Sequence, residues 1–425
     1  MDEIEELRRR GVEVIAGSVR WPDKQALLND RPWLDPKLVV LQPIQLALAV
    51  QAAWLCVWRW RRIADLLQRV ILCGRETPIQ RGKALLHTWL GACYALRLEE
   101  RGVEHIHAHH GYFASWIAMV AARLLHVSYS MTLHGSDLLT HAVYLDTKLK
   151  NCRFCVTISE YNRRYILEHY STIEAGRLVV ARLGVDVPGL AHFRSASVHA
   201  PTAREPGVGT APDLQFQLLA IGRLHAVKDH ALLLRACAQL GRRGLDFHCE
   251  IAGEGPERHN LEQLIRQYEL EDRVRLLGYV PRGQQECLYQ KADLIVLTSR
   301  SEGIPLVLME AMARGNIVLA PAITGVPELV VEGQTGFLYE AGSVDDFVTR
   351  VLWLRTQSSG RGSADRSPGL PGASQLDWVR QQAREQIRRH YNREKNLEAF
   401  GNLFLERMDG LSENFQHADP VLQQI

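Results

Sequence analysis

Residues 292–315 read ADLIVLTSRSEGIPLVLMEAMARG, and this stretch decides the fold of the second half of the chain. Its first part, ADLIVLTS, has the length and the apolar, β-branched content of a buried strand. A polar loop follows. Pro305 then suits the first turn of a helix, which we expect to end before Gly315. Strand, loop and helix in this order are typical of a parallel sheet with crossover helices.

The same alternation extends outward from this stretch in both directions. Residues 193–213 interrupt it, because they are rich in Ser, Pro, Gly and Ala and show no apolar period, which indicates a linker. We therefore expect an α/β protein with an amino-terminal domain over residues 1–192 and a carboxy-terminal domain over 214–375. Residues 376–425 would form a tail that is helical from about residue 376 to residue 407.

Composition excludes several classes of protein. The 425 residues are 46% hydrophobic and 23% charged, which excludes a disordered or collagen-like chain. The net charge of +2 is too small to indicate nucleic-acid binding through an overall excess of positive charge. Eight cysteines are too few for a disulfide scaffold, and we expect them to be reduced in a cytoplasmic protein. The pair Cys152 and Cys155 is interpreted as core packing rather than a metal or redox site, because no second pair completes a zinc site.

Residues 46–58, LALAVQAAWLCVW, form the longest apolar stretch. The stretch is shorter than the roughly 20 residues that a membrane-spanning helix needs. It is followed by RWRR, and Trp54, Trp58 and Trp60 lie within or beside it. A basic helix with tryptophans can lie on an anionic membrane surface. A core helix with a charged exit is the alternative interpretation.

Two cations follow the strand-like segment QLLAIG. Arg223 and Lys228 lie in GRLHAVK, which leads into the helix-like segment DHALLLRACAQL. A helix N-terminus adds unpaired N–H donors and the positive end of a dipole. Arginine supplies a planar fork and lysine a point charge, so the pair suits a diphosphate. Taken alone, the two could equally be solvated surface charges.

Two carboxylates lie on either side of the point where the loop passes into the helix in residues 292–315. Glu302 lies in the loop and Glu310 on the helix, about 10 Å apart along the helix axis. That separation is too large for two carboxylates acting on one bond, but it suits two separate hydroxyl-bearing groups of a ligand. Backbone N–H groups of Gly303 and Ile304 could hold phosphates between them, and the loop at Gly325 could close the same pocket.

These segments together resemble the nucleotide-sugar-binding domain of glycosyltransferase family 4, which comprises retaining enzymes of the GT-B fold. The matching strings include GRLHAVKDHALLLRA, IAGEGP, RVRLLGYVP and GVPELVVEGQTGFL, and the E-x7-E spacing is the family's signature. The similarity covers residues 218–347 and extends more weakly back to residue 104. The first half most resembles the exopolysaccharide and colanic-acid branch. The resemblance implies two Rossmann-like, doubly wound parallel-sheet domains facing across a cleft, with a tail that partly returns to the first domain.

The resemblance also implies a role for each site residue. Arg223 and Lys228 would neutralise the diphosphate of the donor. Glu310 would hold the ribose hydroxyls, and Glu302 would hold hydroxyls of the transferred sugar. His134, in TLHGSD, would face the sugar from across the cleft. The two cations would stabilise the departing phosphate, so no metal and no cofactor is expected.

The implied function is a retaining, metal-independent glycosyltransferase of the hexosyltransferase type. It would move a sugar from a nucleotide diphosphate sugar to a glycan or lipid-linked acceptor in surface-polysaccharide synthesis, in the cytoplasm or on the inner face of the membrane. The chain starts with MDEIEELRRRGVEV, which resembles the family's first helix and second strand, so the first strand is expected to be missing. A truncated or non-catalytic GT-B protein that binds nucleotide or a partner is therefore the alternative. An NAD-dependent oxidoreductase is disfavoured because GEGP lacks the rest of a dinucleotide fingerprint and fits a βα turn.

Four histidines cluster in EHIHAHHG, at positions 105, 107, 109 and 110. Their alternation on a strand allows a metal site, a lining of the cleft, or packing. Asp137 is expected to shape its loop. Thr324 stands where many relatives carry a second glycine.

Overall fold

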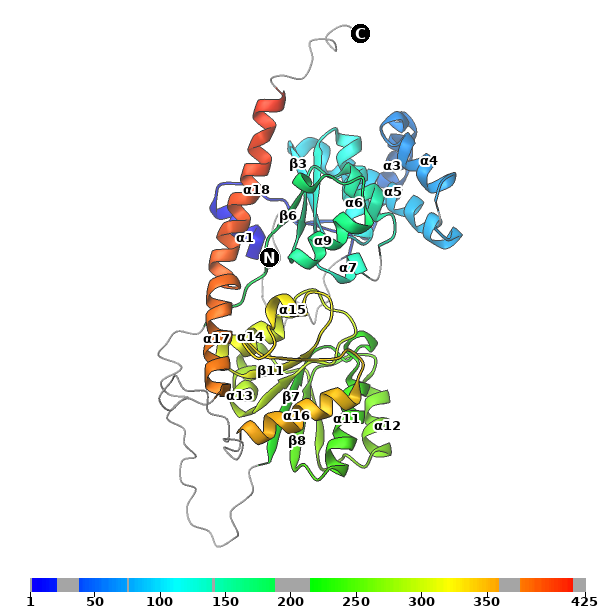
Figure 1. The fold of residues 1–425 in the computed structure, drawn as a ribbon. Coiled ribbons are helices and arrows are strands. Elements are labelled where there is room, and N and C mark those ends of the chain that lie inside the picture. Colours follow the sequence, from blue (N-terminus) through cyan, green and yellow to red (C-terminus); the bar gives the residue numbers. More distant parts are fainter. Residues whose placement is uncertain are drawn as a thin grey trace. The chain divides into compact units, whose positions relative to one another are not determined.

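The structure, a computed structural model, describes residues 2–20, 38–74, 76–139, 142–187, 215–358 and 375–415. The chain divides into two compact units (Figure 1): unit 1 comprises residues 1–181 and 397–425, and unit 2 comprises residues 182–396. The boundary between the units therefore falls after Ala181, earlier than the expected limit at residue 192. The expected linker, residues 193–213, lies outside the described residues.

Unit 2 alternates strands and helices along the chain. Its elements are β7 (Phe216–Ile221), η4 (Ala226–Lys228), α11 (His230–Arg242), β8 (Phe247–Ala252), α12 (Arg258–Gln267), β9 (Val274–Gly278), α13 (Arg282–Lys291), β10 (Leu294–Val296), α14 (Leu306–Arg314), β11 (Ile317–Pro321), α15 (Val326–Leu329), β12 (Phe337–Tyr339), α16 (Val344–Ser358) and α17 (Gln375–His390). The strands form one parallel sheet in the order β12-β11-β10-β7-β8-β9. The sheet is thus doubly wound, and its strand order reverses between β7 and β10.

Both faces of this sheet are buried. Leu294 and Val296 belong to the apolar core on one face, and Ile295 and Leu297 belong to the core on the other. Helices α11, α12 and α16 pack on the first face, and α14 and α15 pack on the second (Figure 1). Burial on both faces explains why the strands of unit 2 are almost continuously apolar in sequence.

The carboxy-terminal tail consists of two helices. Helix α17 ends at His390 and α18 (Arg393–Phe415) begins three residues later. Between them the Val185 N–H donates to the Tyr391 carbonyl over 2.9 Å, and the Arg393 N–H donates to the Val185 carbonyl over 3.1 Å. Pairing with this distant segment replaces the helical hydrogen bonds and buries the Tyr391 ring. Further along α18, Phe400 and Phe404 pack in a small core of unit 1.

Unit 1 contains a smaller parallel sheet and more helices. Its elements are α1 (Asp2–Arg9), β1 (Gly17–Ser18), β2 (Val39–Val40), α3 (Leu46–Trp58), η1 (Trp60–Arg62), α4 (Ala64–Ile71), α5 (Pro78–Leu98), η2 (Glu99–Arg101), β3 (His105–His109), α6 (Phe113–Leu125), β4 (Ser128–Leu133), α7 (Ser136–Leu139), α8 (Leu145–Asn151), β5 (Cys155–Thr157), α9 (Glu160–His169), η3 (Ala175–Arg177), β6 (Leu178–Val180) and most of α18. The main sheet has the order β3-β4-β5-β6, and β1 pairs with β2. Helix α5 packs against α6 and also against α3 and α4. Among the described residues, no helix is both long and apolar enough to cross a membrane.

Two of the clustered histidines form a hydrogen-bonded ladder between β3 and β4. The ring nitrogens of His105 lie 2.7 and 2.6 Å from the hydroxyls of Ser128 and Ser130. Those of His107 lie 2.6 and 2.9 Å from the hydroxyls of Ser130 and Thr132. Burial, with the nearby Arg153 a smaller contribution, lowers the pKa of His105 to about 4, and burial lowers the pKa of His107 well below its usual value. Of the three interpretations of the cluster, packing describes these two rings.

This ladder predicts that acid weakens unit 1. In the folded chain the pKa values of His105 and His107 lie below the usual 6.5, so the unfolded chain binds protons first as the pH falls. The free energy of unfolding should therefore decrease as the pH falls from about 7 toward 5, with a loss of about 2–4 °C in melting temperature for each kcal/mol lost. Thermal unfolding of wild type and of His107→Gln at both pH values measures this, and the variant should show a smaller decrease.

The matched control is His126→Asn, an exposed histidine at the left-handed end of α6, where asparagine is tolerated. This variant should keep the pH dependence of the wild type. If His107→Gln also kept it, the buried ladder would not be the source of the acid sensitivity.

Candidate functional site

The candidate site lies where the strand order of unit 2 reverses. Strands β7 and β10 are neighbours and parallel, so the loops at their carboxyl ends lie side by side. Two hydrogen bonds join these loops: the Arg300 N–H donates to the Val227 carbonyl over 2.8 Å, and the Thr298 hydroxyl donates to the Lys228 carbonyl over 2.9 Å. In doubly wound sheets, ligands bind beyond the carboxyl ends of the strands at this switch point.

Lys228 and Glu302 meet across the two loops. Lys228 Nζ lies 2.6 Å from Glu302 Oε1, and the Ser299 hydroxyl donates to the same oxygen over 2.5 Å. The lysine and glutamate side chains are 20% and 11% exposed, so solvent screens their attraction only in part. The structure thus brings together two residues that the sequence assigned to different parts of one ligand.

Asp229 also joins these two loops. It occupies the N-cap of α11, where Oδ1 accepts a hydrogen bond from the Leu232 N–H over 3.2 Å. Its other oxygen, Oδ2, lies 2.7 Å from Arg300 Nε. The Asp229 side chain is buried. Its carboxylate caps the N-terminus of α11 and also holds the loop that follows β10.

Arg223 is exposed on the loop that follows β7, and the GEGP turn fixes the path of this loop. A Cβ atom on Gly253 would lie 1.9 Å from the Gly222 carbonyl oxygen. One on Gly255 would lie 2.3 Å from the Leu224 carbonyl oxygen. The two glycines therefore let the β8–α12 turn pack backbone to backbone against the loop that carries Arg223.

Glu310 lies on α14 and is held by two neighbours. The Tyr289 hydroxyl, from α13, donates to Glu310 Oε2 over 3.0 Å, and Arg314 Nη1 donates to the Glu310 carbonyl over 2.9 Å. The Arg314 guanidinium also lies over the Tyr289 ring, 4.7 Å from its centroid. Burial and the adjacent Glu310 carboxylate raise the pKa of Tyr289, which therefore stays protonated as a donor. This contact orients the carboxylate.

The loop after β11 supports the Glu302 segment. Thr324 has a φ of +42°, a conformation that glycine adopts readily and threonine rarely. Its hydroxyl donates to the Glu302 carbonyl over 2.6 Å, a contact that glycine could not make. Next to it, a Cβ atom on Gly325 would lie 2.2 Å from the Gly303 carbonyl oxygen. The Ile304 side chain is buried in the core, so only its backbone could contact a ligand.

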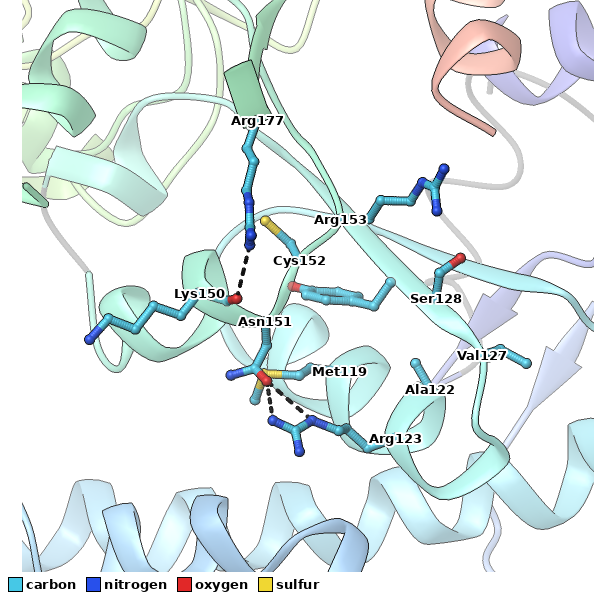
Figure 2. Close-up of a pocket in the computed structure, with 11 residues that line it drawn as sticks. Met119, Ala122, Arg123, Val127, Ser128, Lys150, Asn151, Cys152, Arg153 and Arg177 are labelled. Carbon is cyan, nitrogen blue, oxygen red and sulfur yellow. Dashed lines mark hydrogen bonds between the residues drawn. The ribbon is translucent and has the colours of Figure 1, made fainter. Parts of the chain in front are cut away.

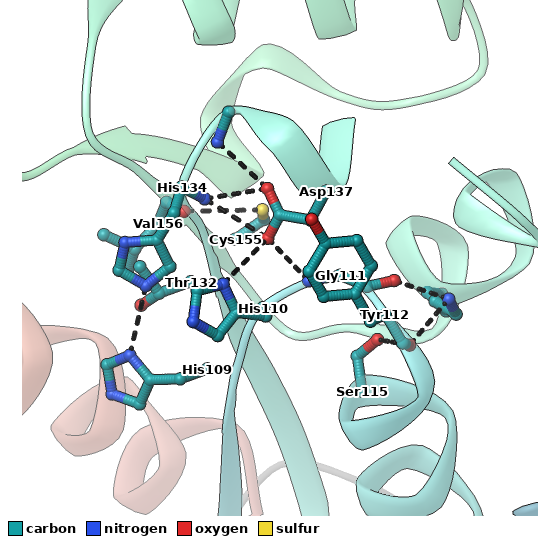
Figure 3. A network of polar contacts seen from close by, with 12 residues as sticks. His109, His110, Gly111, Tyr112, Ser115, Thr132, His134, Asp137, Cys155 and Val156 are labelled. Carbon is teal, nitrogen blue, oxygen red and sulfur yellow. Dashed lines mark hydrogen bonds and ion pairs between the residues drawn. The ribbon is translucent and has the colours of Figure 1, made fainter. Parts of the chain in front are cut away.

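In unit 1, Asp137 holds the loop that contains His134 (Figure 3). The carboxylate accepts hydrogen bonds from the N–H groups of Gly111, His134 and Gly135 over 2.7, 3.0 and 2.9 Å. Burial alone would raise the pKa of Asp137, but the nearby His110 ring and the Gly111 N–H outweigh burial and lower it. The carboxylate thus stays ionised and joins the loops that follow β3 and β4.

The His134 ring is a neutral imidazole at physiological pH. Burial, followed by the neighbouring His110 and His109, lowers its pKa to about 4. Its Nε2 lies 3.4 Å from His109 Nδ1, and His109 Nε2 lies 3.1 Å from Glu3 Oε2 (Figure 3 shows the first of these contacts). His134 can therefore exchange hydrogen bonds with a ligand, but it adds no positive charge.

Lys148 also contacts this region, through its ammonium group. Its ammonium donates to the carbonyls of Gly111, Tyr112 and Val143 over 2.6, 3.0 and 2.8 Å. The side chain is buried, and burial lowers its pKa to about 7. All three N–H donors are thus used on backbone carbonyls, which indicates a positioning role.

A pocket of about 360 Å³ lies at the end of β4 opposite to the His134 loop (Figure 2). Its lining includes four cations, Arg123, Lys150, Arg153 and Arg177. Arg123 Nε donates to the Asn151 side chain over 3.1 Å, and Arg177 Nη1 donates to the Lys150 carbonyl over 3.3 Å. In Figure 2 the Lys150 and Arg153 side chains extend away from the pocket. The cations do not converge, and we assign no function to this pocket.

Several residues of the site region were not predicted from the sequence. Tyr289 reaches Glu310 from a different helix, so no local motif connects them. The same holds for Lys148, whose three partners lie in two loops. Asp229 did have a signal, since an aspartate directly before an amphipathic segment is a typical N-cap.

The chain is similar to known glycosyltransferases in sequence. Residues 203–364 match the family model described as glycosyl transferases group 1. WcaL of Escherichia coli K12, named for colanic acid biosynthesis, is 31% identical over 229 residues, which are 51% of this chain and 48% of WcaL. The amylovoran biosynthesis glycosyltransferase AmsK of Erwinia amylovora is 32% identical over 36% of this chain and 38% of its own length. The matches thus span about half or less of these relatives.

Solved structures show the same fold. A glycosyltransferase from Rickettsia africae ESF-5 superposes with a TM-score of 0.58 at 17% identity, over 80% of this chain and 84% of that one. HepE of Anabaena, solved in complex with UDP and glucose, superposes with a TM-score of 0.57 at 18% identity, over 74% and 80%. These likenesses concern the fold and confirm the expected α/β GT-B class. Residues 203–364 therefore belong to the glycosyl transferases group 1 family, within a chain of the GT-B fold.

Proposed function

We propose that the chain is a retaining, metal-independent glycosyltransferase. It moves a sugar from a nucleotide diphosphate sugar to a glycan or lipid-linked acceptor, in surface-polysaccharide synthesis on the cytoplasmic side of the membrane. The observation that carries the proposal is the Lys228–Glu302 pair at the switch point of unit 2, with Arg223 on the adjoining loop. The names of the relatives WcaL and AmsK support polysaccharide synthesis, and the UDP and glucose bound to HepE support the donor class.

The donor's diphosphate binds at the loop after β7. An ammonium group has three N–H donors, so Lys228 can hold Glu302 and a phosphate oxygen together. Arg223 adds a planar fork, and the N-terminus of α11 adds the positive end of a helix dipole. Glu310, oriented by Tyr289, accepts hydrogen bonds from the ribose hydroxyls.

The sugar lies against Glu302. Oε1 of this carboxylate already accepts from Lys228 and Ser299, and Oε2 accepts from a sugar hydroxyl. His134 is assigned to the same sugar as a neutral hydrogen-bonding group, because its pKa is lowered to about 4 by burial. The assignment of His134 follows the family resemblance.

The main chemical task is to stabilise the leaving group. When the anomeric C–O bond breaks, positive charge grows on the sugar and negative charge grows on the departing phosphate. Lys228 and Arg223 stabilise that anion with fixed positive charge. The acceptor hydroxyl attacks from the face that the phosphate leaves and gives its proton to that phosphate. The anomeric configuration is thereby retained.

Loss of the Lys228 charge should weaken nucleotide binding. Lys228→Ala removes a charge-assisted hydrogen bond of about 1.5–3 kcal/mol, so affinity for UDP or GDP should fall about 10- to 100-fold. Titration calorimetry with both nucleotides measures this, after thermal-shift screening of a panel of nucleotide sugars. Lys291→Ala, an exposed lysine on α13, is the matched control and should bind as wild type does. Undiminished binding and transfer by Arg223→Ala/Lys228→Ala would contradict the proposal.

The two glutamates should separate binding from turnover. Glu310→Gln should weaken nucleoside diphosphate binding, because the ribose loses a charged acceptor. Glu302→Gln keeps a side-chain oxygen to which Lys228 can donate, so nucleotide affinity should stay nearly unchanged, whereas turnover of the sugar should fall about 10-fold or more. Calorimetry with the nucleotide and steady-state kinetics with the donor sugar separate the two effects. Weakened binding by Lys228→Ala and Glu310→Gln, with no transfer by the wild type, would favour the non-catalytic alternative. Wild-type-like binding by both variants would contradict the proposed donor site.

Transfer should not depend on a divalent metal. Because Arg223 and Lys228 supply the positive charge, EDTA should leave the rate of transfer unchanged. The rate is measured with and without chelator on the donor found by the screen. A loss of activity that Mg²⁺ or Mn²⁺ restores would show that a metal carries part of this task.

A further inference from the structure

Helix α3 is apolar on both of its faces. Leu48, Ala52 and Leu55 are buried on the inner face, where α3 packs against α5. The opposite face carries large apolar side chains that are 61–81% exposed, at positions Leu46, Val50, Trp54, Val57 and Trp58. The helix, LALAVQAAWLCVW, contains no charged residue. A helix that is apolar all round is normally buried on all sides.

The exposed residues form one stripe. Leu46, Val50 and Trp54 are four residues apart, and Val57 and Trp58 continue the same helical spacing. Trp60, 54% exposed, follows in η1. Most of the exposed large apolar side chains of the described chain lie within residues 46–86. Contiguous apolar patches on a protein surface mark contact sites for a partner or a membrane.

A basic cluster adjoins the tryptophan end of the stripe. Arg59 and Arg62 donate to the Leu124 carbonyl over 3.0 and 2.6 Å, which fixes their positions beside α6. The Arg59 guanidinium lies 5.3 Å from the centre of the Trp58 ring. Arg61, between them, is exposed. One acidic residue, Glu99, pairs with Arg59 over 2.6 Å, and the cluster keeps an excess of positive charge.

We propose that this outer face of α3 docks on a lipid bilayer that contains anionic headgroups. Tryptophan is favoured at the boundary between headgroups and acyl chains, where its ring is apolar and its N–H remains hydrated. Arginines beside it complement the negative headgroups. The inner face stays in the protein core, so α3 lies along the surface and does not span it. The sequence left two alternatives for this segment, a core helix and a membrane-surface helix. The inner face of α3 fits the first alternative, and its outer face fits the second.

This docking surface adds the anionic lipid bilayer as a partner of the proposed glycosyltransferase. It would bring unit 1 to the surface where a lipid-linked acceptor resides. It involves no residue of the donor site, so its failure and that of the proposed transfer are distinguishable.

Vesicle flotation of the full chain tests the surface. Wild type should float with vesicles of phosphatidylcholine and phosphatidylglycerol, and weakly with phosphatidylcholine alone. Val50→Gln/Trp54→Gln/Trp58→Gln should lower the bound fraction at limiting lipid about tenfold, because apolar burial in the bilayer is lost. Arg61→Glu should reduce binding to the anionic vesicles about fivefold or more. Added salt should weaken binding of the wild type.

Trp378→Gln, a partly exposed tryptophan on α17, is the matched control and should bind as wild type does. All substituted side chains are exposed, so melting temperatures without lipid should stay close to wild type. Equal flotation of wild type and the triple variant would overturn the proposal. A second result would also overturn it. If neither protein bound vesicles, and light scattering showed oligomers of wild type but not of the triple variant, a second copy of the chain would be the partner that covers α3.

Discussion

The ion pair between Lys228 and Glu302 is the contact on which the rest of the donor site depends. It joins the loops after β7 and β10, which are neighbours only because the strand order of unit 2 reverses between them. Asp229 and Thr298 fix the same loops, and Gly253 and Gly255 allow the next turn to pack against them. Both faces of the sheet are buried under helices, so the edge that carries these charges has a rigid base. A cation held by a carboxylate in a partly buried position is suited to bind a second anion.

The fold was largely predictable from the sequence because its signals are local. Pro305 and Gly315 mark the two ends of α14, and the apolar run at residues 294–296 marks the strand before it. The alternation of strands and helices indicated a doubly wound sheet. The contacts between distant elements were not predictable. Nothing near Glu310 in the sequence indicates that Tyr289 orients it, and nothing near Glu302 indicates that Lys228 pairs with it. The break between α17 and α18 has the same origin, since it comes from pairing with Val185, far upstream.

Unit 1 combines rigid loops with an exposed apolar surface. Asp137 accepts three backbone hydrogen bonds and Lys148 donates three, so two buried side chains join the loops around His134. The cost of burying these two side chains is offset by their hydrogen bonds to the backbone. Helix α3 differs, because its outer apolar stripe has no such partner among the described elements of the chain. The contacts of Asp137 and Lys148 position the His134 side chain. Exposing the apolar stripe of α3 to water is unfavourable, and docking on a bilayer would remove that cost.

A crystal structure of the chain with bound UDP or GDP would show whether the diphosphate contacts Lys228 and Arg223. The diphosphate should lie at the loop after β7, with phosphate oxygens about 3 Å from Lys228 Nζ and within reach of the Arg223 guanidinium. The ribose hydroxyls should lie at the Glu310 carboxylate. A nucleotide bound elsewhere, with Lys228 still paired only to Glu302 and Arg223 in solvent, would rule out this donor site.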